Sequence, residues 1–338
     1  MKNILLTGTA GFIGSNFVPY FLEKYPEYNL INLDLLTYAG NLENLSECES
    51  DPRYKFIKGD ICNRELVEFI FTEYDIQGVI HFAAESHVDN SIKNPGVFIE
   101  TNVNGTFTLL DVAYKYWMDK PFAYKDEYKG CRFHHISTDE VYGTLNETDL
   151  FTEETPYAPN SPYSASKASS DMIVRSYQET YGMNTVITNC SNNYGPKQHD
   201  EKLIPTIIRK ALAGEAIPIY GDGKNIRDWL YVLDHCKGID LVYHTGKEAN
   251  VYNIGGRNER TNLQIVDAIC TILDEKVPKE TSYKELITFV EDRAGHDRRY
   301  AIDATKLETE LGWKADENFD TGILKTVDWY LNKYKEAK

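Results

Sequence analysis

The sequence predicts an α/β fold in which a doubly wound parallel sheet is joined to a smaller α/β domain. Over the first 190 residues, short apolar runs alternate with longer segments of helical periodicity. This alternation is typical of parallel strands that are connected by helices on both faces of a sheet. After residue 190 the alternation loosens, and glycine turns at Gly221–Gly223 and Gly255–Gly256 interrupt the chain. We expect the larger domain to comprise residues 1–190 with a return segment near 226–256, and the smaller one residues 191–225 and 257–338.

Each element is predicted from its own pattern. Six short apolar runs are predicted to be strands: residues 4–6, 30–33, 55–57, 79–82, 133–136 and 185–187. Helices are expected to begin near Phe12, Arg64, Val97 and Ser164 in the larger domain, and near Leu203, Asn262 and Asp320 in the smaller one. The segment at 118–130 is polar and aromatic, and we interpret it as a surface insertion.

The composition limits the classes of function. The chain has 338 residues, 42% of them hydrophobic, and its 36 basic and 52 acidic residues give a formal net charge of -16. Such an acidic chain has no basic stripe for a nucleic-acid backbone, so nucleic acid is disfavoured as a partner. Six isolated cysteines are typical of reduced thiols, and no cluster has the spacing of metal ligands. No stretch approaches the ~20 apolar residues of a membrane span, so we expect no membrane partner. From the isolated cysteines we expect a cytoplasmic protein, and from the lack of ligand spacing we expect no metal.

Three glycines, Gly8, Gly11 and Gly14, lie between the first predicted strand and the first predicted helix. They allow a tight turn and let backbone N–H groups approach a pyrophosphate at the helix N-terminus. Asp34 ends the second predicted strand 20 positions after Gly14, where a carboxylate can bind the hydroxyls of a ribose. No Arg lies beside Asp34 to accept a 2′-phosphate, so the motif predicts a Rossmann domain that binds NAD. The alternative, a turn that needs glycine for packing alone, does not explain the acid.

Tyr163 and Lys167 are four residues apart and therefore share one face of a predicted helix. Pro162 is suited to the first helical position, with Ser161 as the N-cap. A nearby ammonium favours a phenolate, so we expect Lys167 to lower the pKa of Tyr163 well below its free value of about 10 and to make it a base. A solvated helix face is the alternative, and the position after the fifth predicted strand disfavours it.

Two adjacent carboxylates, Asp139 and Glu140, follow the fifth predicted strand. Ligands of doubly wound sheets bind beyond the carboxyl ends of the strands, so reacting groups belong at this position. If the pocket desolvates one carboxyl group, that group retains its proton and the pair divides the roles of acid and base. An exposed acidic turn is the alternative in so acidic a chain.

Several segments carry a resemblance to a known family, and STDEVYG at 137–143 is the most specific of them. The others are LTYAGNLENL, HFAAESHVDNS, NCSNNYGP followed by EKLIP, IRDWLYVLDH, YNIGG with Asn258, and EDRAGHDRRYAID. On these segments the chain is identified as a member of the extended short-chain dehydrogenase/reductases, and it most resembles the dTDP-glucose 4,6-dehydratases among them. Epimerases of the same superfamily typically lack the Asp-Glu pair.

The resemblance implies a reaction that uses a bound NAD and regenerates it in each cycle, converting dTDP-glucose to a 4-keto-6-deoxy sugar and water. Tyr163 would take the proton of the 4-hydroxyl, and Thr138 would hydrogen-bond the 4-oxygen. Glu140 would remove the proton from carbon 5, and Asp139 would protonate the departing 6-hydroxyl. Lys167 would complete the catalytic set.

The resemblance also implies two sets of binding residues. The cofactor is expected to contact Gly8, Gly11, Phe12, Ile13, Gly14, Asp34, Thr37, Asp60, Ile61, Ala83, Ala84, Tyr163 and Lys167. The substrate is expected to contact Ser86, His87, Thr138, Asn192, Lys202, Leu203, Arg227, Asn258, Arg293 and His296. Arg227 and Arg293 are the candidates for the diphosphate, because a planar guanidinium binds two phosphate oxygens. Neither His87 nor His296 is expected to transfer a proton.

The resemblance further implies a homodimer, formed by the helices near 97–116 and 164–181. Lys197 departs from the family pattern, which has an aromatic residue at this position. Two other functions remain open. A UDP-sugar 4-epimerase or decarboxylase would share the glycine motif and Tyr163 but would not need the acid pair. An inactive NAD-binding sensor would be expected to have lost one of these residues.

Overall fold

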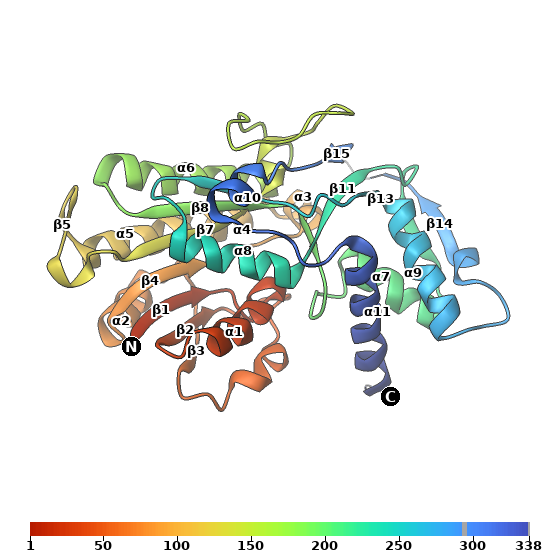
Figure 1. The fold of residues 1–338 in the computed structure, drawn as a ribbon, viewed down its shortest axis with the longest axis horizontal. Coiled ribbons are helices and arrows are strands. Elements are labelled where there is room, and N and C mark those ends of the chain that lie inside the picture. Colours follow the sequence, from red (N-terminus) through yellow and green to blue (C-terminus); the bar gives the residue numbers. More distant parts are fainter. Residues whose placement is uncertain (293–295, 337–338) are drawn as a thin grey trace.

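The fold is taken from a computed structural model that describes residues 1–292 and 296–336. Figure 1 shows a large sheet covered by helices and, beside it, a smaller region built mainly from helices. No helix in the described part of the chain has the length and apolar character needed to cross a bilayer.

The larger sheet has seven parallel strands in the order β12-β8-β7-β4-β1-β2-β3. The strands are β1 (Lys2–Thr7), β2 (Tyr28–Asp34), β3 (Tyr54–Lys58), β4 (Ile76–His81), β7 (Arg132–Thr138), β8 (Thr185–Cys190) and β12 (Val251–Ile254). The six predicted strands and the predicted α/β class are therefore confirmed. β12 was not predicted, because its four residues have no periodicity that separates them from a loop.

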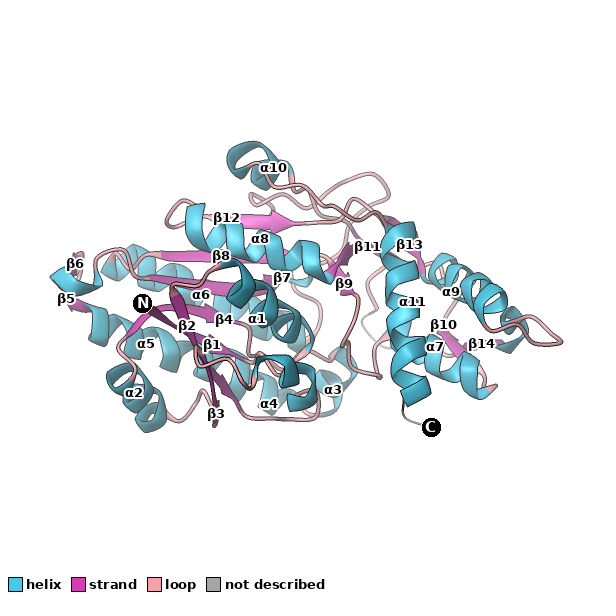
Figure 2. Ribbon diagram, turned by 60° about the horizontal axis from the view of Figure 1, so that its bottom comes forward, coloured by secondary structure: helices cyan, strands magenta, loops and turns pink. Residues whose placement is uncertain are grey.

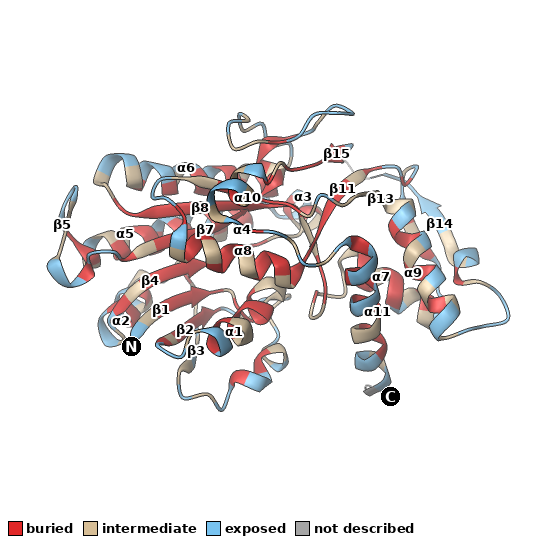
Figure 3. Ribbon diagram, in the orientation of Figure 1, coloured by how far each residue is buried: buried red, intermediate tan, exposed pale blue. Residues whose placement is uncertain are grey.

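Helices cover both faces of this sheet (Figures 1 and 2). One hydrophobic core joins the sheet to α1 (Phe12–Lys24) and α8 (Val232–Thr245), and a second joins it to α2 (Arg64–Glu73), α5 (Thr106–Trp117) and α6 (Pro162–Tyr181). Most of the strands are buried and contain short apolar runs, and Figure 3 shows them as the most buried part of the molecule, whereas β3 at the edge of the sheet is only partly buried.

The helix expected near Val97 is interrupted at its start. It comprises α3 (Val88–Lys93), α4 (Pro95–Phe98) and a π-helical turn η2 (Ile99–Gly105) before α5. The predicted insertion at 118–130 is a hairpin of β5 (Met118–Lys120) and β6 (Ala123–Tyr124) followed by the 3₁₀ turn η3 (Asp126–Tyr128). Two further 3₁₀ turns, η1 (Leu42–Cys48) and η4 (Asp139–Tyr142), follow β2 and β7.

The smaller region has its own core and two small sheets. Its strands are β9 (Asn192–Tyr194), β10 (Ile217–Tyr220), β11 (Ile226–Tyr231), β13 (Glu259–Thr261), β14 (Ile287–Val290) and β15 (Arg299–Tyr300). Its helices are α7 (Leu203–Ala213), α9 (Asn262–Lys276), η5 (Tyr283–Leu286) and α11 (Phe319–Glu336), whereas α10 (Thr305–Leu311) packs against β12 and α8 in the core of the larger sheet. β9 pairs with β11 directly after β8, so the two regions are connected at the carboxyl edge of the large sheet. In the segment 226–256, β11 belongs to the small sheets, whereas α8 and β12 belong to the larger sheet.

Candidate active site

A cavity of about 320 Å³ lies at the carboxyl edge of the large sheet. Residues that follow β1, β2, β3, β4, β7 and β8 line it, together with residues of α6. A doubly wound sheet presents its loops at this edge, so ligands are bound there. Each predicted cofactor residue lines this one cavity: Gly8, Gly11, Phe12, Ile13, Gly14, Asp34, Thr37, Asp60, Ile61, Ala83, Ala84, Tyr163 and Lys167.

The glycine turn has the geometry that a dinucleotide requires. Gly8 has a positive φ of 73°, and a Cβ built on it would lie 2.5 Å from the Cα of Ala83. A Cβ on Gly14 would lie 2.4 Å from the Cα of Thr9, so this glycine lets α1 approach the turn. α1 begins at Phe12, directly after the turn, and its first N–H groups are available to an anion.

The carboxylate of Asp34 is fixed by two backbone N–H groups, one of them in the glycine turn. Its Oδ2 accepts a hydrogen bond from the backbone N of Ala10 at 2.9 Å, and its Oδ1 accepts one from Leu36 N at 2.8 Å. Burial raises the pKa of Asp34, while these two backbone donors oppose the shift. A carboxylate fixed in this way at the end of β2 fits the ribose of an adenosine, and the residues present therefore fit NAD.

The two adjacent carboxyl groups differ in environment. Asp139 is 2% exposed, and its Oδ2 is buried without a hydrogen-bond partner among the described residues. Burial, with the negative charge of Glu140 next, raises the pKa of Asp139 well above its ordinary value. Glu140 is only half-buried, and both residues line the cavity. The raised pKa favours the protonated form of Asp139, as expected if the pocket desolvates one member of the pair.

Because Asp139 is buried without an adequate partner, Asp139→Asn is expected to stabilise the protein. A carboxyl group with a raised folded-state pKa opposes folding once the pH exceeds its unfolded value, and the penalty grows up to the folded-state pKa. The gain should be larger at pH 8 than at pH 5, because the cost of ionising the buried carboxyl group falls as the pH approaches its unfolded-state pKa. Thermal unfolding at both pH values measures it. A variant that melts lower than the parent at pH 8 would contradict the assignment.

Tyr163 and Lys167 are presented by the first turns of α6. Ser161 caps this helix, because its Oγ accepts from Ser164 N at 3.1 Å, and Pro162 occupies the first position as predicted. Tyr163 is 8% exposed and Lys167 is 3% exposed.

The expected lowering of the Tyr163 pKa by Lys167 is wrong for this arrangement. Burial, followed by the charge of Glu140, raises the pKa of Tyr163 well above 10. The physical reason is that the Lys167 side chain points toward the backbone of β7. Its Nζ donates to the backbone oxygen of Ile136 at 2.8 Å and lies 3.5 Å from His135 Nε2.

The predicted substrate residues fall into two groups. Ser86, Thr138, Asn192 and Lys202 line the cavity, and Lys202 Nζ donates to the backbone oxygen of Ser86 at 3.2 Å. Leu203 begins α7 next to Lys202 and does not line the cavity. His87 lies just before α3 and also outside the lining, with its Nε2 3.8 Å from Glu201 Oε2.

The remaining substrate candidates lie beyond the cavity wall. Arg227 is buried, donates to the backbone oxygen of Asp297 at 2.9 Å, and stacks on Tyr300, with its Cζ 4.2 Å from the ring centroid. Its charge nevertheless acts on Asp139, whose pKa it lowers in part. Asn258 donates to Gly256 O, and its Oδ1 accepts from the first N–H of α11, so its side chain has a structural role here.

The last segment of the resemblance is only partly described. His296 Nδ1 lies 2.6 Å from Asp292 Oδ1. The predicted Arg293 lies outside the described residues, so its place in the site stays a prediction. Among residues 1–292 and 296–336, no group of three or more His, Cys, Asp or Glu side chains is arranged to hold a metal ion.

Lys197, in the loop after β9, contacts both α1 and η1. Its Nζ donates to the backbone oxygen of Asn44 at 2.8 Å and of Ser15 at 3.2 Å, and it lies 2.8 Å from Glu47 Oε1. The residue that departs from the family pattern therefore holds η1 and α1 together. Residue type alone does not indicate this, because the three partners are more than 140 positions away in the chain.

The sequence comparisons agree with this geometry. A family model described as GDP-mannose 4,6 dehydratase matches residues 5–326. The dTDP-glucose 4,6-dehydratase of Salmonella typhimurium (strain LT2) is 56% identical over 337 residues, covering 97% of this chain and 92% of that protein. The enzyme of the same name from Neisseria gonorrhoeae is 52% identical, covering 98% and 96%. The chain belongs to the dTDP-glucose 4,6-dehydratase family.

Solved structures of dTDP-glucose 4,6-dehydratases have the same fold. The Bacillus anthracis (strain Ames) structure, in complex with NAD, is 49% identical, covers 99% of this chain and 98% of that one, and has a TM-score of 0.87. The Streptomyces venezuelae structure, also with NAD bound, is 43% identical with the same coverage and a TM-score of 0.88. The UDP-glucose 4-epimerase of Thermotoga maritima has a TM-score of 0.84 at 28% identity, covering 98% and 99%. The predicted family and fold are confirmed, and the fold is shared with the epimerases.

Sequence reasoning missed several residues around this dehydratase cavity. Glu85, Gln198, His199 and Glu201 line it, and none belongs to a spacing pattern that identifies it. Behind Lys167 lies a second group that was also missed. One of its members, Asp171, is four positions after Lys167, and this helical spacing was a usable indication.

Proposed function

We propose that the chain is an NAD-dependent hydro-lyase that converts dTDP-glucose to dTDP-4-keto-6-deoxyglucose and water. The observation that carries this proposal is the buried Asp139, whose pKa is raised, beside Glu140 in the same cavity as Tyr163 and the glycine turn. An elimination needs an acid and a base side by side, and this pair supplies both. The relatives named above bear out the activity and the cofactor.

The first chemical task is removal of the proton from the 4-hydroxyl. We assign it to Tyr163, with Thr138 donating a hydrogen bond to the 4-oxygen and polarising the ketone as it forms. The residues around the glycine turn and Asp34 would hold NAD, which would supply the hydride acceptor for carbon 4, the hydride donor for carbon 6, and a positive charge in this cavity. Because burial and Glu140 oppose the phenolate, Tyr163 depends on positive charge brought near it.

The second task is elimination across carbons 5 and 6. The ketone at carbon 4 makes the hydrogen on carbon 5 acidic, and Glu140 removes it. Asp139 gives its proton to the 6-hydroxyl, which departs as water. Glu140 then returns its proton to carbon 5, so the two carboxyl groups act on neighbouring carbons. Each positioned proton transfer contributes about 10²–10⁴-fold to the rate.

Binding of the nucleotide is proposed for the smaller region. Lys202 and Asn192 line the cavity from segments after β8, and Arg227 lies behind them with a charge that reaches Asp139. We therefore keep residues 1–190 with the return segment as the cofactor domain and the remaining residues as the sugar-nucleotide domain. Within the return segment, β11 supplies Arg227 to the substrate side.

The two other functions are less favoured. The fold does not separate a dehydratase from an epimerase or decarboxylase, as the Thermotoga maritima likeness demonstrates. The acid pair separates them, because neither rival reaction needs a proton donor aimed at carbon 6. An inactive sensor would not be expected to keep Thr138, Asp139, Glu140, Tyr163 and Lys167 together around one cavity.

A homodimer and a cytoplasmic location complete the proposal. Phe107 on α5 is 42% exposed, Met172 on α6 is 49% exposed, and Ile99 before α5 is 48% exposed. These apolar side chains lie on the helices that the family uses for pairing, and a second copy would cover them. All six cysteines are free thiols, which suits a reducing compartment.

The activity is tested by mass spectrometry of dTDP-glucose incubated with purified protein and no added NAD. Loss of one water with a new 4-ketone is expected, because the cofactor is regenerated and stays bound. UDP-glucose is the matched control for the nucleobase of the substrate, because it carries uracil in place of thymine. If neither sugar loses water, even with NAD supplied, the dehydratase assignment is wrong.

A further inference from the structure

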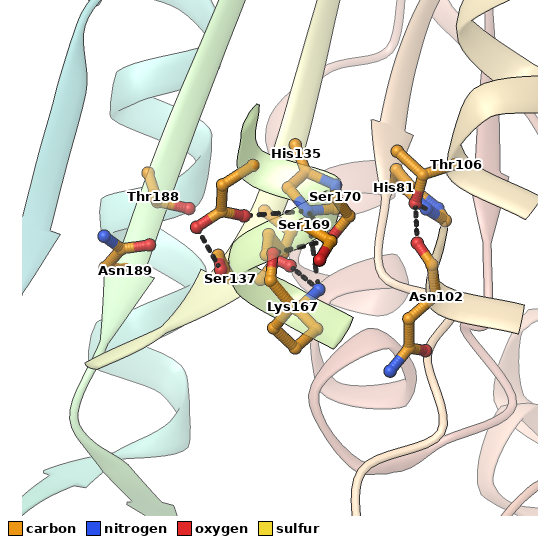
Figure 4. A network of polar contacts seen from close by, with 12 residues as sticks. His81, Asn102, Thr106, His135, Ser137, Lys167, Ser169, Ser170, Thr188 and Asn189 are labelled. Atoms are coloured by element: carbon orange, nitrogen blue, oxygen red, sulfur yellow. Dashed lines mark hydrogen bonds and ion pairs between the residues drawn. The ribbon is translucent and has the colours of Figure 1, made fainter. Parts of the chain in front are cut away.

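Behind Lys167, on the side away from the cavity, lies a fully buried group of polar side chains (Figure 4). His135 of β7 and Asp171 of α6 are both 0% exposed, and His135 Nε2 lies 3.2 Å from Asp171 Oδ1. Lys167 Nζ lies 3.5 Å from the same ring nitrogen. Ser170 Oγ is 3.2 Å from it as well. The same ring nitrogen therefore faces both the ammonium and the carboxylate, and as an acceptor from Lys167 it has no proton to donate to Asp171.

Asp171 is not placed there by the needs of the fold alone. Its Oδ2 accepts from Ser137 Oγ at 2.8 Å and from Tyr157 OH at 3.0 Å. Its Oδ1 accepts no hydrogen bond among the described residues. Burial raises the pKa of Asp171 to about 6, an effect that Lys167 partly opposes. An incompletely bonded buried carboxylate destabilises a protein, so its presence beside a lysine of the site calls for a function.

Among the described titratable groups that interact with Lys167, Asp171 is the one that carries an opposite charge. Burial lowers the pKa of Lys167 to about 8, and Asp171 is the largest influence that raises it. The other titratable groups that act on this lysine, or on which it acts, are His81, His135 and Cys190. Burial lowers the pKa values of the two histidines and raises that of the thiol, so all three are neutral at pH 7.

We propose that Asp171 is the buried counter-ion of Lys167 and acts through His135, which spaces the two charges and holds the ammonium at the back of the active site. This assignment rests on the proposed function, in which Lys167 lines the reaction cavity together with Tyr163. Asp171 is a positioning residue, because it does not line the cavity and so does not contact the reacting atoms. Its effect on the reaction is to keep Lys167 charged in an apolar setting.

The test is the pH dependence of turnover in Asp171→Asn. Without the carboxylate, the pKa of Lys167 falls further, so the variant loses the ammonium at a pH where the parent still has it. The ratio of parent to variant kcat is expected to rise between pH 6 and pH 9, by about tenfold for each unit by which the lysine pKa falls. KM for dTDP-glucose should change much less than kcat. His135→Gln should give a smaller rise of the same sign.

Asp240→Asn is the matched control. Asp240 is also a buried carboxylate, paired with Lys24 at 2.6 Å between α1 and α8, away from the cavity. Its loss should lower the melting temperature and leave the kcat ratio flat across the pH range. If the ratio of parent to variant kcat is also flat for Asp171→Asn, the assignment of Asp171 as the counter-ion is wrong.

A second readout does not depend on activity. In a thermal-unfolding cycle of Lys167→Met, Asp171→Asn and the double variant, the double variant should melt higher at pH 6 than Asp171→Asn alone, because it leaves no unpaired buried ammonium. Additive changes would overturn the proposal. If the parent converts dTDP-glucose and both readouts are flat, the counter-ion fails while the dehydratase stands; if the parent converts no sugar, the proposed function itself fails.

Discussion

Tyr163→Phe is expected to lower the turnover of dTDP-glucose by at least about 10³-fold, within the range of a positioned proton transfer. The substitution removes only the oxygen that accepts the proton of the 4-hydroxyl. The ring keeps its edge contact with Phe98, whose centroid is 6.3 Å away, so the start of α6 should remain in place. kcat is measured from formation of the 4-ketone, and NAD retention from the cofactor released on denaturing the purified variant.

Tyr128→Phe is the control for this change. Tyr128 is buried in the same cofactor-binding half but donates to Asp75 at 2.8 Å, far from the cavity. It should turn over dTDP-glucose at the parent rate. Turnover of Tyr163→Phe within tenfold of the parent would remove Tyr163 from the role of base.

Glu140→Gln is expected to abolish exchange of the carbon 5 hydrogen with solvent and to lower turnover by about 10²–10⁴-fold. The amide keeps the size of the side chain but cannot accept a proton. The measurement is deuterium incorporation at carbon 5 when the reaction runs in heavy water, followed by mass spectrometry or NMR.

Asp139→Asn is the contrasting variant in the same experiment. It keeps the base and removes the acid, so carbon 5 should still exchange while loss of water slows. Glu153→Gln serves as the neutral control, because Glu153 accepts from Asn253 N at 2.8 Å and supports β12. Normal deuterium incorporation in Glu140→Gln would exclude Glu140 as the base at carbon 5.

The large sheet could be predicted because its information is local. Most of its strands are buried and contain short apolar runs, and the glycine turn, Asp34 and the acid pair all lie at or just after strand ends. The full set of predicted cofactor residues came from the family resemblance, and it lines one cavity. Strands such as β9 and β13 were missed, because three residues carry too little pattern to be distinguished from a loop.

The parts of the site that could not be predicted depend on long-range contacts. His135 and Asp171 belong to different elements, and only the packing of α6 on β7 brings them together. The hydrogen-bond partner of Lys167 could not be predicted either. Its Nζ donates to Ile136 O, and this depends on the conformation of the side chain. For Arg227, residue type suggested a phosphate ligand, whereas its guanidinium is engaged with Asp297 O and Tyr300.

The contacts of Lys197 have a consequence for the order in which the chain assembles. They connect residue 197 to positions 153 and 182 residues earlier, and β12 joins the large sheet later still in the chain. Closing such loops costs entropy that only the finished contact repays, so these connections form late. While the ribosome has released only the first half of the chain, η1 can already pack on α1 through Leu45, but the bridge from Lys197 is missing. The nascent protein therefore cannot complete its cofactor pocket until the loop after β9, with Lys197 and the cavity-lining Lys202, has been released.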